Sequence, residues 1–261
     1  MAAERALDRV VPAVTFLAGL AFWEGIVRYN HVPTYILPPP TLVLITLYQD
    51  WGTLSGSLWV TLTIMTKALT TAVIGSLVLS IIFSQSRLAE RAFYPFAVAL
   101  QVTPVVSIAP LLLIYLSGSE AVLVCAFLVS FFPLLANTTL GLNSADHNLV
   151  DLFRLYRATR LQELWLLRIP SALPYFLAGL RISGGLALIG AIVAEIAAGT
   201  AGKSAGLAFR IVESGYRLNI PRMFAALLLI AIIGVLVHLI LTAISYWLLR
   251  DWHDSAQRRE N

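Results

Sequence analysis

Residues 146–174 read DHNLVDLFRLYRATRLQELWLLRIPSALP and form the one long amphipathic, charged segment of an otherwise apolar sequence. Apolar residues recur at helical spacing twice, from Leu149 to Tyr156 and again from Leu161 to Trp165. Between the two runs, Thr159 is followed three residues later by Gln162, which is the capping-box pattern. The segment therefore predicts two short helices, the second of which begins near residue 160.

The second of these helices is predicted to end at Ile169-Pro170, because proline lacks an amide donor and restricts the residue before it. The resulting helix-turn-helix would expose its charged side chains to water. Such a surface has no obvious use inside a bilayer and indicates a soluble partner. The charged residues are Asp151, Arg154, Arg157, Arg160, Glu163 and Arg168.

Composition excludes an ordinary soluble domain, because 59% of the residues are hydrophobic, 12% are charged and mean hydropathy is +0.82. At about 20 residues per spanning helix, the chain has room for six spans and one sizeable loop. We expect an all-α membrane protein that forms a single transmembrane domain over residues 1–261, its first apolar run retained rather than cleaved as a signal peptide. The predicted spans are residues 10–26, 61–83, 93–116, 121–141, 175–198 and 223–249.

Basic residues divide unevenly between the segments that alternate across these spans. Eleven lie on the side of the N-terminus and five on the other side, with Lys67 and Arg181 left near span ends. The positive-inside rule then places both termini and the 146–174 loop in the cytoplasm. We expect a multi-pass protein of a bacterial-type plasma (inner) membrane.

The 146–174 segment resembles the cytoplasmic loop of ABC-importer permeases, whose pattern is EAA, three residues, Gly, nine residues, Ile, one residue and Leu-Pro. On this chain the pattern falls on Asp151-Leu152-Phe153, Arg157, Leu167 and Ile169-Pro170. The spacing and the proline match the family pattern, whereas most of the other residues differ from it. The following text, residues 171–181, and Ala191-Ile-Val-Ala-Glu195 are similar to the nitrate/sulfonate/taurine branch of that family.

This resemblance implies the type I ABC importer permease fold, with the loop as a coupling helix that docks on an ATPase subunit. It also implies a dimer, here expected to be a homodimer, with two ATPase subunits that bind ATP and Mg and an extracytoplasmic solute-binding protein. Arg157 in place of Gly leaves open whether the tight turn forms there or at Ala158-Thr159. The residues expected to couple to the ATPase are Asp151, Arg154, Arg157, Ala158, Thr159, Arg160 and Pro170.

Polar residues inside the spans are costly in lipid unless they line a cavity or find partners. Pro104 and Pro110 lie near the polar residues of the third span. Prolines can kink a helix and leave backbone carbonyl groups without their helical hydrogen-bond donors. Lining of a translocation pathway and hydrogen bonding between helices both remain open for these side chains. The pathway candidates are Gln101, Ser107, Asn137, Ser183 and Glu195.

Bond chemistry is not expected of this chain. Residues 198–204 resemble a phosphate-binding loop, but the position that requires glycine is Ala197 and no strand precedes it. The four histidines are scattered without a second ligand at helical spacing, so no metal site is predicted, and no nucleophile–base pair is visible. We therefore expect no cofactor on this chain and no nucleic-acid partner.

The sequence predicts the transmembrane permease subunit of an ATP-driven importer for a small polar solute. The branch that it resembles handles nitrate, sulfonates such as taurine, and pyrimidine vitamin precursors, and the choice among them stays open. The alternative is an ion-coupled secondary transporter that uses Glu195 and Arg181 as coupling groups. The docking-shaped loop argues against that alternative.

Overall fold

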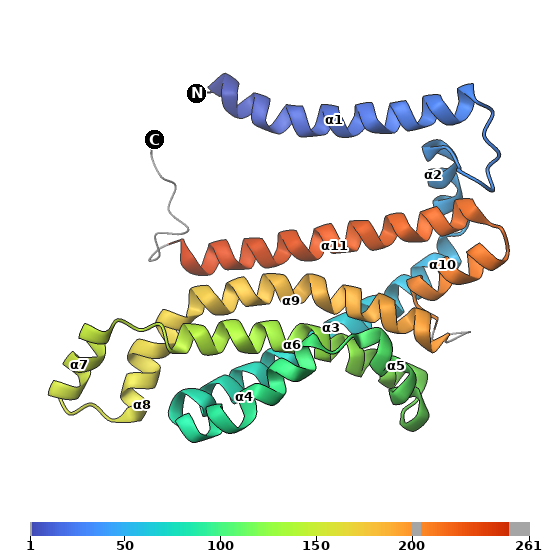
Figure 1. The fold of residues 1–261 in the computed structure, drawn as a ribbon. Helices are drawn as coiled ribbons and strands as arrows, with labels where there is room; N and C mark the ends of the chain where they lie inside the picture. The colour runs from blue at the N-terminus through green and yellow to red at the C-terminus, as the bar shows by residue number, and fades with distance from the viewer. Residues whose placement is uncertain (1, 200–204, 251–261) are drawn as a thin grey trace.

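Long helices lie side by side in this protein, with shorter helices at both ends (Figure 1). The computed structural model describes residues 2–199 and 205–250, and the regular elements of these residues are all helical. Their bounds are α1 (Ala2–Tyr29), α2 (Pro40–Gln49), α3 (Trp51–Gln85), α4 (Arg87–Val102), α5 (Val105–Tyr115), α6 (Gly118–Leu142), α7 (His147–Leu155), α8 (Arg160–Glu163), a π-helical turn (Leu164–Arg168), α9 (Ile169–Ala198), α10 (Leu207–Tyr216) and α11 (Ile220–Leu249).

Five helical stretches are long and apolar enough to cross a membrane, and the bent pair α4 and α5 makes up to six. The predicted spans 10–26, 61–83, 121–141, 175–198 and 223–249 each fall within one of these stretches, which extend further at one or both ends. The five stretches are Val10–Tyr29, Trp51–Gln85, Gly118–Leu142, Arg160–Ala198 and Ile220–Leu249. The protein is therefore an all-α, multi-pass membrane protein.

The predicted third span, residues 93–116, is divided between two helices, α4 and α5. It breaks at Thr103-Pro104, and the axes on either side of the break differ by 106°. Thr103 takes an extended conformation at φ −75° and ψ 124°, as expected for a residue before proline. Because Pro104 is extended as well, a new helix starts at Val105. The sequence indicates that Pro104 and Pro110 can kink this span, and the break lies at Pro104.

Helices α6 and α9 pack tightly along the middle of the molecule (Figure 1). A Cβ atom placed on Gly190 of α9 would lie 2.9 Å from the Cα of Ala126 in α6, closer than real Cβ contacts. The Ser183 hydroxyl donates to the backbone carbonyl of Ser130 at 2.7 Å. Small residues thus bring the two backbones together, which is how helices gain packing energy in lipid.

The two ends of the molecule differ in what they carry. Helices α7 and α8 project at the end where α1 begins and α11 finishes, whereas α2, α5 and α10 lie toward the opposite end (Figure 1). At that opposite end, Arg222 of α11 forms a bidentate ion pair with Asp50, at 2.6 and 2.8 Å. This pair fixes the start of α11 to the junction of α2 and α3.

Candidate functional site

The turn of the helix-turn-helix forms at Arg157. Its φ of 54° is left-handed, and the N–H groups of Arg157 and Ala158 donate to the carbonyls of Arg154 and Phe153, each at 2.9 Å. This pair of bonds is the Schellman motif that ends many helices, usually with glycine in the left-handed position. Arg157 therefore occupies the position of the pattern's glycine, and the alternative turn at Ala158-Thr159 is not used.

The second helix begins as predicted and continues further than predicted. The Thr159 hydroxyl accepts from the N–H of Gln162 at 3.3 Å, while the Thr159 N–H donates to the Gln162 side chain at 2.7 Å, so the capping box is confirmed. Pro170, however, does not end this helix, because it lies in the first turn of α9 and the chain stays helical to Ala198.

The π-helical turn explains why Pro170 is tolerated. Here the N–H of Ile169 reaches back five residues to the carbonyl of Leu164. Proline cannot donate to the carbonyl four residues earlier and its ring clashes with that group. A π-helical turn is wider than an α-helical one, so it relieves this clash without ending the helix. The loop is thus continuous with a membrane-spanning helix.

Four of the six charged loop residues face water, whereas Glu163 and Arg168 do not. The side chains of Glu163 and Arg168 are only 15% and 22% exposed and pair at 2.6 Å. Arg168 also donates to the carbonyl of Leu142, at the end of α6, at 3.4 Å. The expectation that all six are solvent-facing was therefore wrong for this pair, which ties the second helix to the bundle.

Several large apolar side chains of the loop are exposed. Buried side chains, among them Val150 and Leu167, anchor the loop inward. At the end of α7, Leu155 and Tyr156 are 80% and 81% exposed. A cluster of large exposed apolar side chains on a surface element indicates an interaction site. Its members are Leu149, Leu152, Leu155, Tyr156, Leu161, Trp165 and Leu166, and we call it the loop apolar surface.

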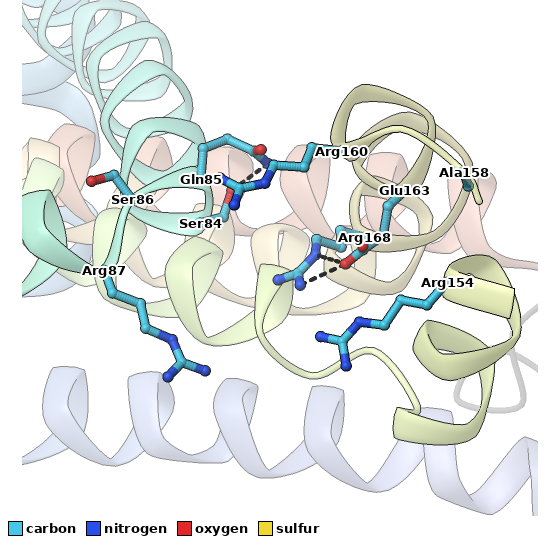
Figure 2. Close-up of a pocket in the computed structure, with 9 residues that line it drawn as sticks. All are labelled: Ser84, Gln85, Ser86, Arg87, Arg154, Ala158, Arg160, Glu163 and Arg168. Atoms are coloured by element: carbon cyan, nitrogen blue, oxygen red, sulfur yellow. Dashed lines mark hydrogen bonds and ion pairs between the residues drawn. The ribbon is translucent and has the colours of Figure 1, made fainter.

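A polar cavity of about 650 Å³ separates the loop from the turn between α3 and α4 (Figure 2). We call it the arginine cavity, because four arginines line it. Sequence analysis missed it, since its walls come from two segments far apart in the chain. Its lining residues are Ser84, Gln85, Ser86, Arg87, Arg154, Ala158, Arg160, Glu163 and Arg168.

A second cavity, of about 400 Å³, lies at the break between α4 and α5. Gln101, Thr103 and Pro104 line it from the break, and residues of α6 and α9 such as Leu128 and Gly190 close its other side. Among the pathway candidates, the structure places Gln101 here. Ser107 is exposed on α5 and does not line this cavity.

The other pathway candidates hold hydrogen bonds within or between helices. Asn137 donates to the carbonyl of Pro133 at 2.8 Å within α6, and Ser183 donates to α6 as described above. Glu195 is 1% exposed and accepts from the Thr61 hydroxyl at 2.8 Å and from the N–H of Ala208 at 3.0 Å. The structure therefore does not bring the five candidates together around one cavity.

The Glu195 carboxylate ties three helices together. Thr61 of α3, which donates to it, accepts in turn from the N–H of Leu207 at 3.0 Å, so the two side chains bind the first N–H groups of α10. Gly206 is required beside them, because a Cβ atom there would collide with the carboxylate. Among the described residues, Glu195 has no cationic partner, and Arg181 is exposed elsewhere on α9. Residues 200–204, which hold most of the segment that resembles a phosphate-binding loop, lie outside the described part.

Comparison with known proteins identifies relatives over most of the chain. The formylaminopyrimidine transport permease protein ThiX of Halalkalibacterium halodurans is 32% identical over 89% of this chain and 92% of its own length. The riboflavin transport system permease protein RibX of Chloroflexus aurantiacus is 32% identical over 93% and 90%. The taurine transport system permease protein TauC of Escherichia coli is 28% identical over 91% and 88%.

The fold and a family model agree with these relatives. A crystal structure of an amino acid ABC transporter matches 77% of this chain and 96% of its own with a TM-score of 0.63, at 17% identity, which shows a shared fold. The family model described as binding-protein-dependent transport system inner membrane component matches residues 72–252. The chain therefore belongs to this family and is a permease subunit of the nitrate/sulfonate/taurine branch of ABC importers.

Proposed function

We propose that this permease works as a homodimer in which the two copies enclose a pathway for a small polar solute. Within α4, all of whose residues are described, no side chain is buried, and Leu111 and Ile114 of α5 are exposed as well. These elements carry Gln101 and Ser107. A second copy that faced α4 and α5 would bring two sets of such polar groups around one path.

The loop transmits the movement of an ATPase subunit to the spans. Three features support this role: the left-handed turn at the pattern's glycine position, the loop apolar surface, and the helix that runs unbroken from Arg160 to Ala198. Because that helix is continuous, a displacement of the docked loop moves a membrane-spanning element as a rigid body. The coupling residues remain Asp151, Arg154, Arg157, Ala158, Thr159, Arg160 and Pro170.

ATP hydrolysis belongs to the partner subunits in this proposal, with ATP and Mg bound there. An extracytoplasmic binding protein would deliver the solute, and this chain would carry out no bond chemistry. The relatives named for formylaminopyrimidine and riboflavin transport are 32% identical and the one named for taurine is 28% identical. Nitrogen heterocycles are therefore the first solutes to test, followed by sulfonates.

Co-purification tests the docking role of the loop. The tagged chain, taken from its own membranes in mild detergent, is expected to bring down a stoichiometric subunit with Mg-dependent ATPase activity. The double variant Leu155→Ala/Tyr156→Ala should lose most of that subunit, because it removes the most exposed part of the loop apolar surface. Leu88→Ala is the matched control, since Leu88 is 79% exposed but lies on α4.

A triple variant, Arg154→Ala/Arg157→Ala/Arg160→Ala, separates the charges from the apolar contacts. Retention of the ATPase in the triple variant and its loss in the double variant would assign docking to the apolar side chains. Retention in both variants would contradict docking through this loop. If no ATPase accompanies a well-folded wild-type chain, the proposed coupling is wrong.

A further inference from the structure

The arginine cavity carries more positive charge than its own acidic groups can balance. Arg87, Arg154, Arg160 and Arg168 line it, and its one carboxylate, Glu163, is already paired with Arg168 at 2.6 Å. Arginine guanidinium groups recognise phosphate and carboxylate through planar, charge-assisted hydrogen bonds. A cavity with this lining therefore favours an anion.

The cationic groups approach the cavity from two separate segments. Figure 2 shows Arg154, Arg160 and Arg168 extending from the loop toward the α3–α4 turn, from which Arg87 projects. With respect to the described residues, the guanidinium groups of Arg87 and Arg160 have no hydrogen-bond or ion-pair partner. Arg154 pairs only with Asp151, at 3.2 Å, and both of these side chains are more than two-thirds exposed. Ion pairs that are this exposed hold a guanidinium weakly, so Arg154 remains available.

The start of α4 adds to this field. Ser86 caps that helix and accepts from the N–H of Ala89 at 3.2 Å, and both Ser86 and Arg87 line the cavity. The N-terminus of a helix carries partial positive charge, here on a helix of 16 residues. This partial charge adds to the positive potential of the arginines, which are the main anion-binding groups of the cavity.

A neighbouring cavity of about 520 Å³ continues the same surface. It shares Ser84, Arg87, Arg154 and Arg168 with the arginine cavity and adds one acidic residue, Glu90, and His147. Across both cavities, four arginines therefore face two carboxylates, one of which is already paired. The combined space is large enough for a phosphate group with an organic substituent, and larger than one carboxylate side chain needs.

The location favours a ligand at the membrane surface. Helix α3, which contains a candidate span, ends at Gln85, and the helical stretch that leads into the span of α9 begins at Arg160, so both elements meet the cavity at their ends. Basic pockets at the cytoplasmic ends of spanning helices suit the headgroups of anionic lipids.

We infer that the arginine cavity binds the phosphate group of an anionic ligand, such as a phospholipid headgroup, between the coupling loop and the α3–α4 turn. The inference rests on the proposed function in one respect, since a headgroup of the cytoplasmic leaflet requires the loop to be cytoplasmic. Bound phosphate would bridge Arg87 to arginines of the loop and so hold the loop against the end of α3.

Lipid and phosphate binding to the full-length chain, purified with any subunits that accompany it and stripped of lipid, tests this inference. Native mass spectrometry would follow titration with phosphatidylglycerol and with phosphatidylcholine, whose phosphate is offset by choline. Calorimetry would follow inorganic pyrophosphate alone. The test variant is Arg87→Gln/Arg160→Gln. The matched control is Arg91→Gln/Arg217→Gln, which removes the same charge from two exposed positions outside both cavities and outside the coupling residues.

A lipid headgroup would be supported if the wild type prefers phosphatidylglycerol to phosphatidylcholine. The affinity for phosphatidylglycerol should then fall roughly tenfold in the test variant and less than about twofold in the control. Pyrophosphate binding with the same variant pattern and no preference between lipids would support a soluble phosphate instead. Equal binding by wild type and both variants would overturn the proposal. Loss of the ATPase subunit from the test variant, with phosphate and lipid binding unchanged, would also overturn it, because the arginines would then belong to the subunit contact. Size-exclusion profiles establish that each variant is folded.

Discussion

Arg157 takes a backbone conformation that residues with a Cβ atom usually avoid. A left-handed φ costs a non-glycine residue about 1 kcal/mol, and here the two Schellman bonds hold it in place. Arg157→Gly should therefore stabilise the turn by up to about 1 kcal/mol, whereas Arg157→Ala should not. Amide hydrogen exchange at residues 154–158 would measure the difference, and faster exchange in the glycine variant would contradict it.

Glu195 and Gly206 form a single packing and hydrogen-bonding unit. Glu195→Ala leaves the N–H of Ala208 without an acceptor in a buried site, which costs roughly 1–3 kcal/mol. Gly206→Ala should also destabilise the protein, because its Cβ atom collides with the Glu195 carboxylate. Thermal unfolding in detergent would measure both losses.

The double variant Glu195→Ala/Gly206→Ala then provides the decisive comparison. Removal of the carboxylate removes the group that the new methyl would strike, so the combined loss should be smaller than the sum of the two single losses. A strictly additive double variant would show that Gly206 is constrained by something other than Glu195.

Gly190 governs how closely α6 and α9 approach. Gly190→Ala forces a Cβ atom against the backbone of Ala126 and should destabilise the chain by roughly 1–3 kcal/mol. Gly185→Ala, on the same helix, is the matched control, because nothing lies within 4 Å of the Cβ atom that it adds. Unfolding temperatures in one detergent would compare them, and equal temperatures would refute close packing at Gly190.

The sequence predicts helices well where local signals decide them, and less well where proline is involved. The capping box at Thr159 forms as the spacing indicates, because both partners are three residues apart. Pro104 breaks its helix while Pro170 does not, since a π-helical turn precedes Pro170 and accommodates its ring. Whether proline breaks a helix or is accommodated by a π-helical turn depends on tertiary packing, which a local sequence pattern does not contain.

The candidate site likewise combines features that local sequence indicates with features that depend on how the helices pack. The left-handed turn falls at Arg157, where the family pattern has glycine, whereas the sequence left open a turn at Ala158-Thr159. The hydrogen bond from Thr61 to Glu195 joins residues 134 positions apart, and the arginine cavity joins the α3–α4 turn to the loop. These arrangements follow from the order in which helices pack, which a single sequence does not reveal.

The arrangement of the helix ends and the distribution of basic residues together predict how the molecule is oriented in the membrane. The start of α1, the loop and the end of α11 lie at one end, while α2, α5 and α10 lie toward the other (Figure 1). The excess of basic residues on the loop side predicts that this end is cytoplasmic. Tyr35 and Tyr216 should then face outward from the cell, and Asn148 should face the cytoplasm.

Single-cysteine labelling decides that orientation. In a Cys125→Ala background, a membrane-impermeant maleimide should label Tyr35→Cys and Tyr216→Cys in intact spheroplasts, because both positions are at least 60% exposed. Asn148→Cys, also exposed, should react only after permeabilisation. The unsubstituted chain is the control: Cys125 is 0% exposed, so it should stay unlabelled in both conditions. Labelling of residue 148 in intact spheroplasts would reverse the orientation and place the loop where no cytoplasmic ATPase can reach it.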